Sequence, residues 1–206
     1  MFKKVLVANR GEIAVRIIQT LREMGITSVA VFSNADRHSL HVLLADEAIC
    51  IGGPRATDSY LNMRNVVSAA ILSGAEAVHP GFGFLSENAE FAKLVTDAGL
   101  AFIGPKPTAI EQMGDKAVAR QTMIDIGVPV IPGSRPLQDV DTALAAAQAI
   151  GYPLMLKASA GGGGKGIRKL ASADDLTAEF AGAQAEAQAA FGCLLYTSPS
   201  PRDYAA

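Results

Sequence analysis

The first part of this 206-residue chain is predicted to fold as a doubly wound α/β domain, in which helices cover both faces of a parallel sheet. From residue 1 to about residue 113, short apolar runs alternate with longer segments of helical periodicity. Half of the chain is hydrophobic and only 18% is charged, so it can bury a core, and wholesale disorder is excluded.

Five short apolar runs are predicted as the strands of this domain. They are residues 5–8, 28–32, 48–51, 77–78 and 101–103. Cys50 falls in the third run and is expected in the core, because a free cysteine behaves as a small apolar residue.

Helices are predicted between these strands. The first begins near Glu12, has apolar residues at three- or four-residue spacing, and ends at Gly25, where a left-handed residue is favoured after a helix. The next helical segments are 41–45, 61–73 and, with Ser86 as the N-cap, a segment to about residue 98.

The pattern changes after residue 113, where the regular alternation gives way to helices and a hairpin. The predicted elements are a helix over 116–126, a linker over 127–136, a helix over 139–150, strands over 152–159 and 167–170, and a helix over 173–190. The two strands flank a run of glycines, and strands joined by a glycine loop are typical of a hairpin.

The last fourteen residues, 193–206, continue neither the final helix nor any capping signal. Residues 193–203 resemble the in-frame translation of a transposase sequencing adapter. We therefore exclude 193–206 from the fold as a non-native tail, and we expect the chain to be a truncated gene product.

Charge and cysteine content exclude several classes of function. A formal net charge of −2 gives no electrostatic case for binding nucleic acid or an anionic membrane. Two cysteines cannot form a disulfide framework, and no apolar run approaches the roughly 20 residues of a membrane helix. The first apolar run is too short for a secretory signal, so we expect a soluble cytoplasmic protein.

The strongest local signal for chemistry is the glycine run between Lys157 and Lys165. A run of glycines costs backbone entropy, and one reason for it is a loop whose N–H groups close on an anion. Lys157, on the strand just before the loop, is placed to meet the same phosphates. A Walker A loop is excluded, because Gly166 and a strand follow Lys165 instead of Ser or Thr and a helix. The segment predicts phosphate binding; a flexible hairpin without a ligand is the alternative.

Two other turns stand at the carboxyl ends of predicted strands, where open α/β sheets bind ligands. Residues 9–12, Asn-Arg-Gly-Glu, lack the G-x-G-x-x-G spacing of a dinucleotide fingerprint, and a simple βα turn is favoured. His79 opens a turn-rich segment, and alone it is interpreted as a hydrogen-bonded loop residue, not as a catalyst. No His/Cys cluster has metal-ligand spacing, and no serine lies in a G-x-S-x-G elbow.

Taken together, the motifs resemble the biotin carboxylase family over residues 1–192, which is less than half of a complete member. They are Val7 to Ala14 (VANRGEIA), Ser33 to Arg37 (SNADR), Leu43 to Glu47 (LLADE), His79 to Asn88 (HPGFGFLSEN), Phe102 to Pro105 (FIGP), Met113 to Lys116 (MGDK) and Lys157 to Gly166 (KASAGGGGKG).

The resemblance implies that an N-terminal α/β domain over 1–113 is followed by the first part of an α+β ATP-grasp domain over 114–192. In this family ATP activates bicarbonate as carboxyphosphate, and the carboxyl group passes to a ureido nitrogen of biotin on a carrier domain or protein. Lys116 and Lys157 would bind the nucleotide phosphates, and the glycines would form a lid: Gly161, Gly162, Gly163 and Gly164.

Other roles follow from the resemblance as well. Phe82 and Gly83 would border the biotin pocket, although some relatives have tyrosine in place of Phe82. Arg16 and Glu23 match a homodimer contact. The family's magnesium-binding glutamates and its catalytic groups come from the later part of the domain, so no catalytic or metal-binding residue is assigned here, and the chain is expected to be inactive.

Two further hypotheses stay open on the sequence. One is another ATP-grasp ligase, such as a carbamoyl phosphate or purine-pathway enzyme, which shares glycine loops and lysines. The other is a non-catalytic α/β module that only binds or dimerises. Replacing Lys157 with Ala would abolish nucleotide affinity in either ligase and change nothing in the module.

Overall fold

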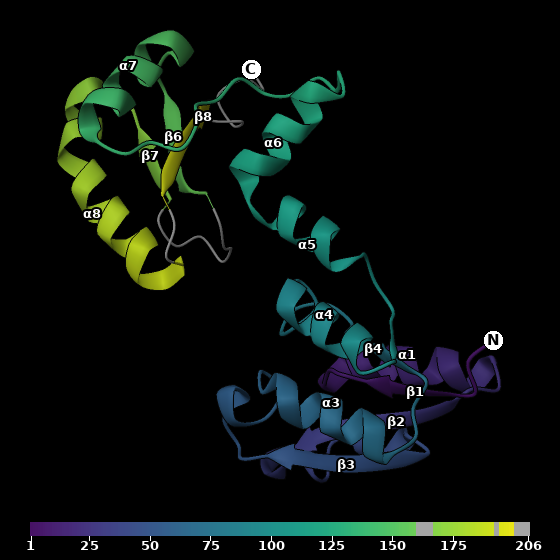
Figure 1. Cartoon of the computed structure of the whole chain (residues 1–206). Helices are drawn as coiled ribbons and strands as arrows, with labels where there is room; N and C mark the ends of the chain where they lie inside the picture. Colours follow the sequence, from purple (N-terminus) through teal and green to yellow (C-terminus); the bar gives the residue numbers. More distant parts are fainter. Residues whose placement is uncertain (160–166, 192–193, 200–206) are drawn as a thin grey trace. The chain divides into compact units, whose positions relative to one another are not determined.

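A computed structural model describes residues 1–159, 167–191 and 194–199 of the chain. The chain divides into two compact units, Met1–Glu111 and Gln112–Ala206 (Figure 1). None of the helices in the described ranges is long and apolar enough to cross a membrane.

The first unit contains a five-stranded sheet of order β3-β2-β1-β4-β5, and all of its neighbouring pairs are parallel. Its strands are β1 (Lys4–Val7), β2 (Thr27–Ser33), β3 (Glu47–Gly52), β4 (Ala77–His79) and β5 (Ala101–Phe102). The prediction of a parallel doubly wound sheet is confirmed. Strand β1 lies in the middle of the sheet and the strand order reverses between β1 and β4, so a crevice is expected at the carboxyl ends of these two strands.

Helices cover both faces of this sheet because the strands present apolar side chains to both. The helices of the first unit are α1 (Gly11–Glu23), α2 (Leu40–Leu44), α3 (Met63–Leu72) and α4 (Ala89–Asp97), with short 3₁₀ turns at Asn34–Asp36 and Ala56–Asp58. Val5 and Val7 pack with α1, whereas Leu6 between them packs with α3 and α4. This alternation follows from the two-residue period of a strand.

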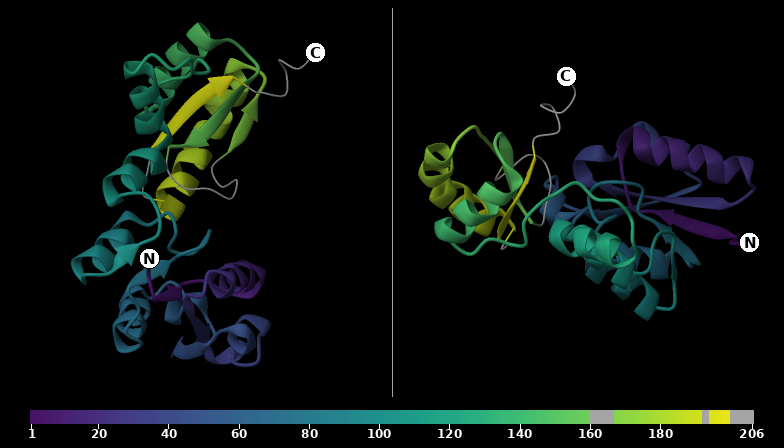
Figure 2. Two further views of the ribbon diagram at one scale, coloured as in Figure 1. Left: turned by 90° about the vertical axis from the view of Figure 1, so that its right-hand side faces the viewer. Right: turned by 90° about the horizontal axis from the view of Figure 1, so that it is seen from above.

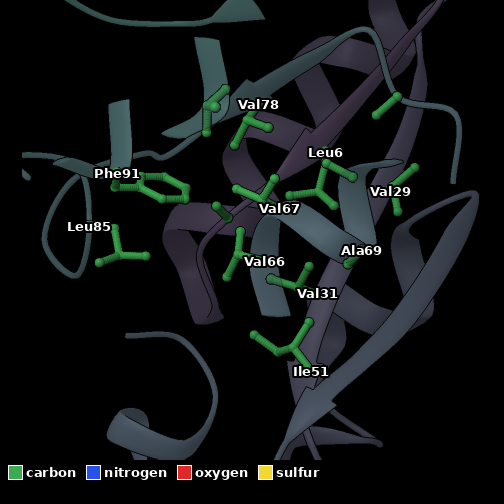
Figure 3. Close-up of a cluster of buried hydrophobic side chains, with 14 of the residues drawn as sticks. Leu6, Val29, Val31, Ile51, Val66, Val67, Ala69, Val78, Leu85 and Phe91 are labelled. Carbon is green, nitrogen blue, oxygen red and sulfur yellow. The ribbon is translucent and has the colours of Figure 1, made fainter. Parts of the chain in front are cut away.

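Figure 3 shows the cluster on the α3 and α4 side, where Leu6, Val29 and Val78 of the sheet meet Val67 and Phe91. These side chains are at most 6% exposed. Each fully buried side chain of this size contributes about 1.5–3 kcal/mol, so the cluster holds the sheet as a firm base for the loops at its ends.

Two local predictions for the first unit are wrong. Asn88, not Ser86, caps α4, because its Oδ1 accepts a hydrogen bond from the backbone N–H of Phe91 at 2.8 Å. Cys50 is exposed, not in the core. It lies on edge strand β3 and points to the face opposite Ile51, which is buried against the core cluster.

Among its described residues, the second unit contains a three-stranded sheet of order β7-β6-β8 and helices that follow and precede these strands. Its elements are α6 (Lys116–Asp125), α7 (Val140–Ile150), β6 (Leu154–Ala158), β7 (Arg168–Leu170), α8 (Ala173–Phe191) and β8 (Leu195–Pro199). Strands β6 and β7 are antiparallel, which confirms the predicted hairpin. Leu154 and Leu156 of β6 pack with α7 and α8, so both helices cover one face of the sheet (Figure 1).

An additional helix, α5 (Pro107–Gly114), leads into the second unit and was not predicted. Its sequence signal is Pro107, since proline is favoured at the first position of a helix.

The exclusion of residues 193–206 from the fold is wrong for β8. This strand pairs with β6 in antiparallel register from Ala158–Leu195 to Leu154–Pro199, and Figure 2 shows it beside β6. Leu195 is fully buried in the core of the second unit. The physical reason is that β6 would otherwise present an unpaired edge, whose N–H and C=O groups can pair with a neighbouring extended segment. The adapter origin of the segment stays a prediction.

Candidate functional site

Lys116 and Lys157 line one pocket of about 390 Å³ in the second unit. Lys116 is the first residue of α6, which Asp115 caps by accepting hydrogen bonds from the N–H groups of Ala117 and Val118 at 2.8 and 3.0 Å. The N–H of Lys116 donates to the carbonyl of Ser159 at 2.7 Å. This bond fastens the start of α6 to the end of β6, the strand that carries Lys157, and so brings the two predicted lysines together.

Arg120 adds a third cationic side chain to the pocket. Its Nε donates to the carbonyl of Ile131 at 3.1 Å. The sequence analysis missed Arg120, although its spacing of four residues places it on the same helix face as Lys116. The remaining wall is mainly apolar: Met113, Ala119, Met123, Val130 and Ile131. Cations beside an apolar wall suit a ligand with phosphates and a flat base.

Strand β8 completes this pocket with Tyr196 and Ser198. Tyr196 pairs with Lys157 in the sheet, and burial raises the pKa of its phenol, which therefore stays neutral at neutral pH. The four glycines of the predicted lid, residues 161–164, lie outside the described residues, and their role stays a prediction.

In the first unit, a second group of predicted residues lies at the strand-order reversal between β1 and β4. Asn9, which follows β1, is fully buried, and its Nδ2 donates to the carbonyls of Pro80 and Phe82 at 2.8 and 2.9 Å. Phe82, a predicted border of the biotin pocket, is 64% exposed. Gly83, the other border residue, adopts a φ of +72°.

His79 ends β4 and is bonded to the start of this loop. Its Nδ1 accepts a hydrogen bond from the N–H of Gly81 at 3.0 Å, which confirms a hydrogen-bonded residue, although His79 is the last residue of β4 and not part of the loop itself. Burial, and then the charge of Arg16, lowers the pKa of His79, so the imidazole is neutral at neutral pH.

A charged network lies beside the loop; Arg10 and Asp36 belong to two motifs of the sequence analysis, which gave them no role, and Tyr60 was not singled out. Arg10 donates two hydrogen bonds to Asp36, and Tyr60 donates its phenolic O–H to Asp36 Oδ2 at 2.7 Å. The Arg10 guanidinium holds the pKa of Asp36 well below its usual range. The ring of Tyr60 stacks on Phe84, with centroids 5.2 Å apart.

Arg16 and Glu23, the predicted dimer-contact residues, both lie exposed on α1. Arg16 borders a groove of about 380 Å³ that is lined mostly by apolar residues, among them Phe2, Met24 and Ile103. Within residues 1–159, 167–191 and 194–199, no group of three His, Cys, Asp or Glu residues is arranged to hold a metal ion.

Two family profiles match the chain in turn. The profile of the biotin carboxylase N-terminal domain matches residues 1–110, and that of the ATP-binding domain of the carbamoyl-phosphate synthase large chain matches residues 115–195. An α/β unit followed by a unit of this second kind defines an ATP-grasp protein. Within that class, the chain belongs to the biotin carboxylase family.

Curated relatives agree with this assignment. The chain is 54% identical to the biotin carboxylase of Nostoc sp. over 192 residues, and 53% identical to biotin carboxylase 1 of Bacillus subtilis over 193 residues. Each match covers 93% of this chain and 43% of the relative. The chain therefore spans less than half the length of these relatives.

Solved structures show the same fold. The biotin carboxylase domain of 2-oxoglutarate carboxylase from Hydrogenobacter thermophilus, a dimer in complex with MgADP, ADP and bicarbonate, has a TM-score of 0.92 at 48% identity. Biotin carboxylase from Campylobacter jejuni has a TM-score of 0.93 at 44% identity. The matches cover 97% of this chain and 44% and 45% of those chains.

Proposed function

We propose that the protein from which this chain derives carboxylates biotin at the expense of ATP and bicarbonate. The carrying observation is that Lys116 and Lys157, from two elements of an ATP-grasp unit, share one pocket with Arg120. The profile matches also support a division into an N-terminal α/β domain over 1–113 and a truncated ATP-grasp domain over 114–192.

The reaction has two steps. A bicarbonate oxygen attacks the γ-phosphorus of ATP. The bond between this phosphorus and the oxygen that bridges it to the β-phosphate breaks, so ADP leaves and carboxyphosphate is formed. The ureido nitrogen of biotin then takes the carboxyl group, inorganic phosphate leaves, and the nitrogen loses its proton. Phosphoryl transfer depends mainly on positioning and charge neutralisation, which Lys116 and Lys157 would supply at the phosphates.

Magnesium, a further component of the reaction, has no binding residues assigned in this chain. The described residues offer no acidic group of three or more that fits the ion, and no step through magnesium is derived from them. We propose that this chain alone does not turn over. We also propose that the parent protein forms a homodimer through the α1 face with Arg16 and Glu23, and serves a biotin carboxyl carrier domain or protein.

The test is a chimaera of residues 1–192 with the remaining length of the Nostoc relative. We expect ATP hydrolysis that requires both bicarbonate and biotin. Lys116→Ala and Lys157→Ala should each lower this rate by roughly 100-fold or more, as expected for removal of a charge-stabilising group. Lys93→Ala is the matched control, because Lys93 lies on the surface in an ion pair with Asp97.

Two results would overturn the proposal. One is a folded chimaera whose ATP hydrolysis ignores biotin, and the other is a Lys157→Ala variant as active as the Lys93→Ala control. Biotin-dependent turnover by the 206-residue chain alone would contradict its predicted inactivity.

A further inference from the structure

The side chain of Asn9 has an unusual set of partners for a fully buried residue. Both N–H bonds of its amide are used on one loop, at the carbonyls of Pro80 (2.8 Å) and Phe82 (2.9 Å). Its Oδ1 accepts from the N–H of Arg10 at 2.9 Å. A single amide thus holds two carbonyls that lie two residues apart, which fixes the curvature of the loop between them.

Gly81, between these two carbonyls, shows how closely the loop is drawn in. It has a φ of +66°, and a Cβ atom there would lie 2.8 Å from Ile13 Cγ2 and 2.9 Å from Asn9 Nδ2. Only glycine fits this approach without a shift of its neighbours.

A second contact, the stacking of Phe84 on Tyr60, holds the far end of the loop. Phe84 has a φ of 44°, which costs energy in a residue other than glycine, and it stacks on Tyr60 with an interplanar angle of 19°. Tyr60 is 3% exposed, accepts from the N–H of Ser33 at 3.0 Å, and donates to Asp36. Through these partners the Arg10–Asp36 pair supports the ring on which Phe84 lies.

Between the Asn9 hydrogen bonds and the Phe84–Tyr60 stack, Phe82 stays largely exposed at the point where the strand order of the sheet reverses. A large apolar side chain that a rigid loop keeps out of the core contributes no burial free energy to folding. A role as part of a preformed ligand-binding surface explains why the loop keeps it exposed. Open α/β sheets bind ligands at this reversal point.

We propose that Asn9 is a positioning residue that presents Phe82 and Gly83, in a fixed conformation, to the carboxyl acceptor, and that Tyr60 acts as a second positioning residue through Phe84. The identity of the ligand, the ureido ring of biotin, rests on the proposed function. The fixed conformation of the loop does not rest on the proposed function, and it can be tested without any ligand.

The chain contains no tryptophan, so Phe82→Trp introduces a single fluorescent reporter at the exposed tip of the loop. In that background, Asn9→Asp keeps the acceptor for Arg10 but removes both donors to the loop. We expect lower tryptophan anisotropy, stronger acrylamide quenching and roughly tenfold faster amide exchange over residues 81–84, since two hydrogen bonds are lost.

Asn65→Ala is the control, because Asn65 also donates to a backbone carbonyl, that of Ile51 at 2.9 Å, but lies outside the loop. It should leave all three readouts at the parent values. If Asn9→Asp does not fold, Phe84→Leu removes the Tyr60 stack at a partly exposed position and is expected to loosen the same loop. A loop that stays as ordered in the folded variant as in the parent overturns the proposal.

The chimaera separates positioning from folding. There, Asn9→Asp should raise KM for free biotin at least tenfold while KM for ATP changes less than twofold. A loosened loop with an unchanged KM for biotin overturns the positioning role. A chimaera without biotin-dependent activity overturns the proposed function instead, and the fluorescence result stands separately.

Discussion

The guanidinium group of Arg10 holds both carboxylate oxygens of Asp36: Nε donates to Oδ2 at 2.8 Å and Nη2 to Oδ1 at 2.5 Å. The side chain of Asp36 is 10% exposed, whereas that of Arg10 is 49% exposed. The pair therefore has one buried and one half-exposed partner. Burial, and then the hydrogen bond to Asp36, raises the pKa of Tyr60 to about 12, so Asp36 carries the negative charge of this group.

Asp36→Asn should lower the free energy of unfolding by about 2 kcal/mol at pH 7, less than the ~3–5 kcal/mol of a fully buried pair because Arg10 reaches water. The pKa of Asp36 is lowered by folding, so its contribution is complete above the unfolded value and is lost as pH falls below about 4. Urea unfolding at pH 7 and pH 3 checks this. A deficit as large at pH 3 as at pH 7 would contradict it.

His41 should make stability depend on pH in a different range. Burial lowers the pKa of this histidine, whose Nε2 lies 3.3 Å from the carbonyl of Val31. Its Nδ1 has no hydrogen-bond partner among the described residues. Below about pH 6.5 the unfolded chain takes up the proton more readily, so stability falls as pH drops from 7 towards the folded pKa. His41→Leu should flatten the urea-unfolding free energy between pH 7 and 5. His79, unchanged in both proteins, cancels in the comparison, and equal slopes would refute the role of His41.

Gly81 and Gly83 form a matched pair for the loop. Both have a positive φ, but only at Gly81 would a Cβ atom meet neighbours within 4 Å. Gly83→Ala should cost about 1 kcal/mol from backbone strain, and Gly81→Ala about 3 kcal/mol from strain plus overpacking. Chemical unfolding of both variants measures the difference. Equal losses would mean that Ile13 and Asn9 can move aside freely.

Leu195 and Thr197 test whether β8 supports the second unit. Leu195→Asp places a charge in the core and should destabilise this unit by at least ~3 kcal/mol. Thr197 is buried, and its Oγ1 has no partner among the described residues, so Thr197→Val should be neutral or stabilising by up to ~1 kcal/mol. Hydrogen exchange of β6 and α8 follows the unit, and exchange of β1 serves as the internal control. Unchanged exchange in Leu195→Asp would show that the unit is stable without this strand.

Elements with a clear local period were predictable from the sequence. The period of α1 and its end at Gly25, and the apolar runs of β1, β2 and β4, depend on neighbours along the chain, and the structure confirms them. Lys116 and Lys157 were each identified, but the bond from the Lys116 N–H to Ser159 that joins their elements is a tertiary contact. No local pattern reveals such a contact.

The misses have the same cause. The predicted βα turn is confirmed, since residues 8–10 join β1 to α1, but the bonds from Asn9 to Pro80 and Phe82 were missed because these partners lie far along the chain. Cys50 sits in an apolar run, yet the run becomes an edge strand only through the order of the sheet. Strand β8 was excluded on the origin of its sequence, whereas pairing depends on an available sheet edge and an extended segment beside it.

The position of β1 in the middle of its sheet has a consequence for biosynthesis. The strand is synthesised before both of its neighbours: it can pair with β2 early, but its other edge stays unpaired until β4 has been made. The side chain of Asn9 can form its two hydrogen bonds to the loop equally late, since the acceptors are 71 and 73 residues further along the chain. N-terminal domains fold first during synthesis, and within a domain the contacts between residues far apart in the sequence form late. The loop with Phe82 therefore reaches its final conformation late in the folding of the first unit. A nascent chain holds this loop in place only after most of that unit has been made.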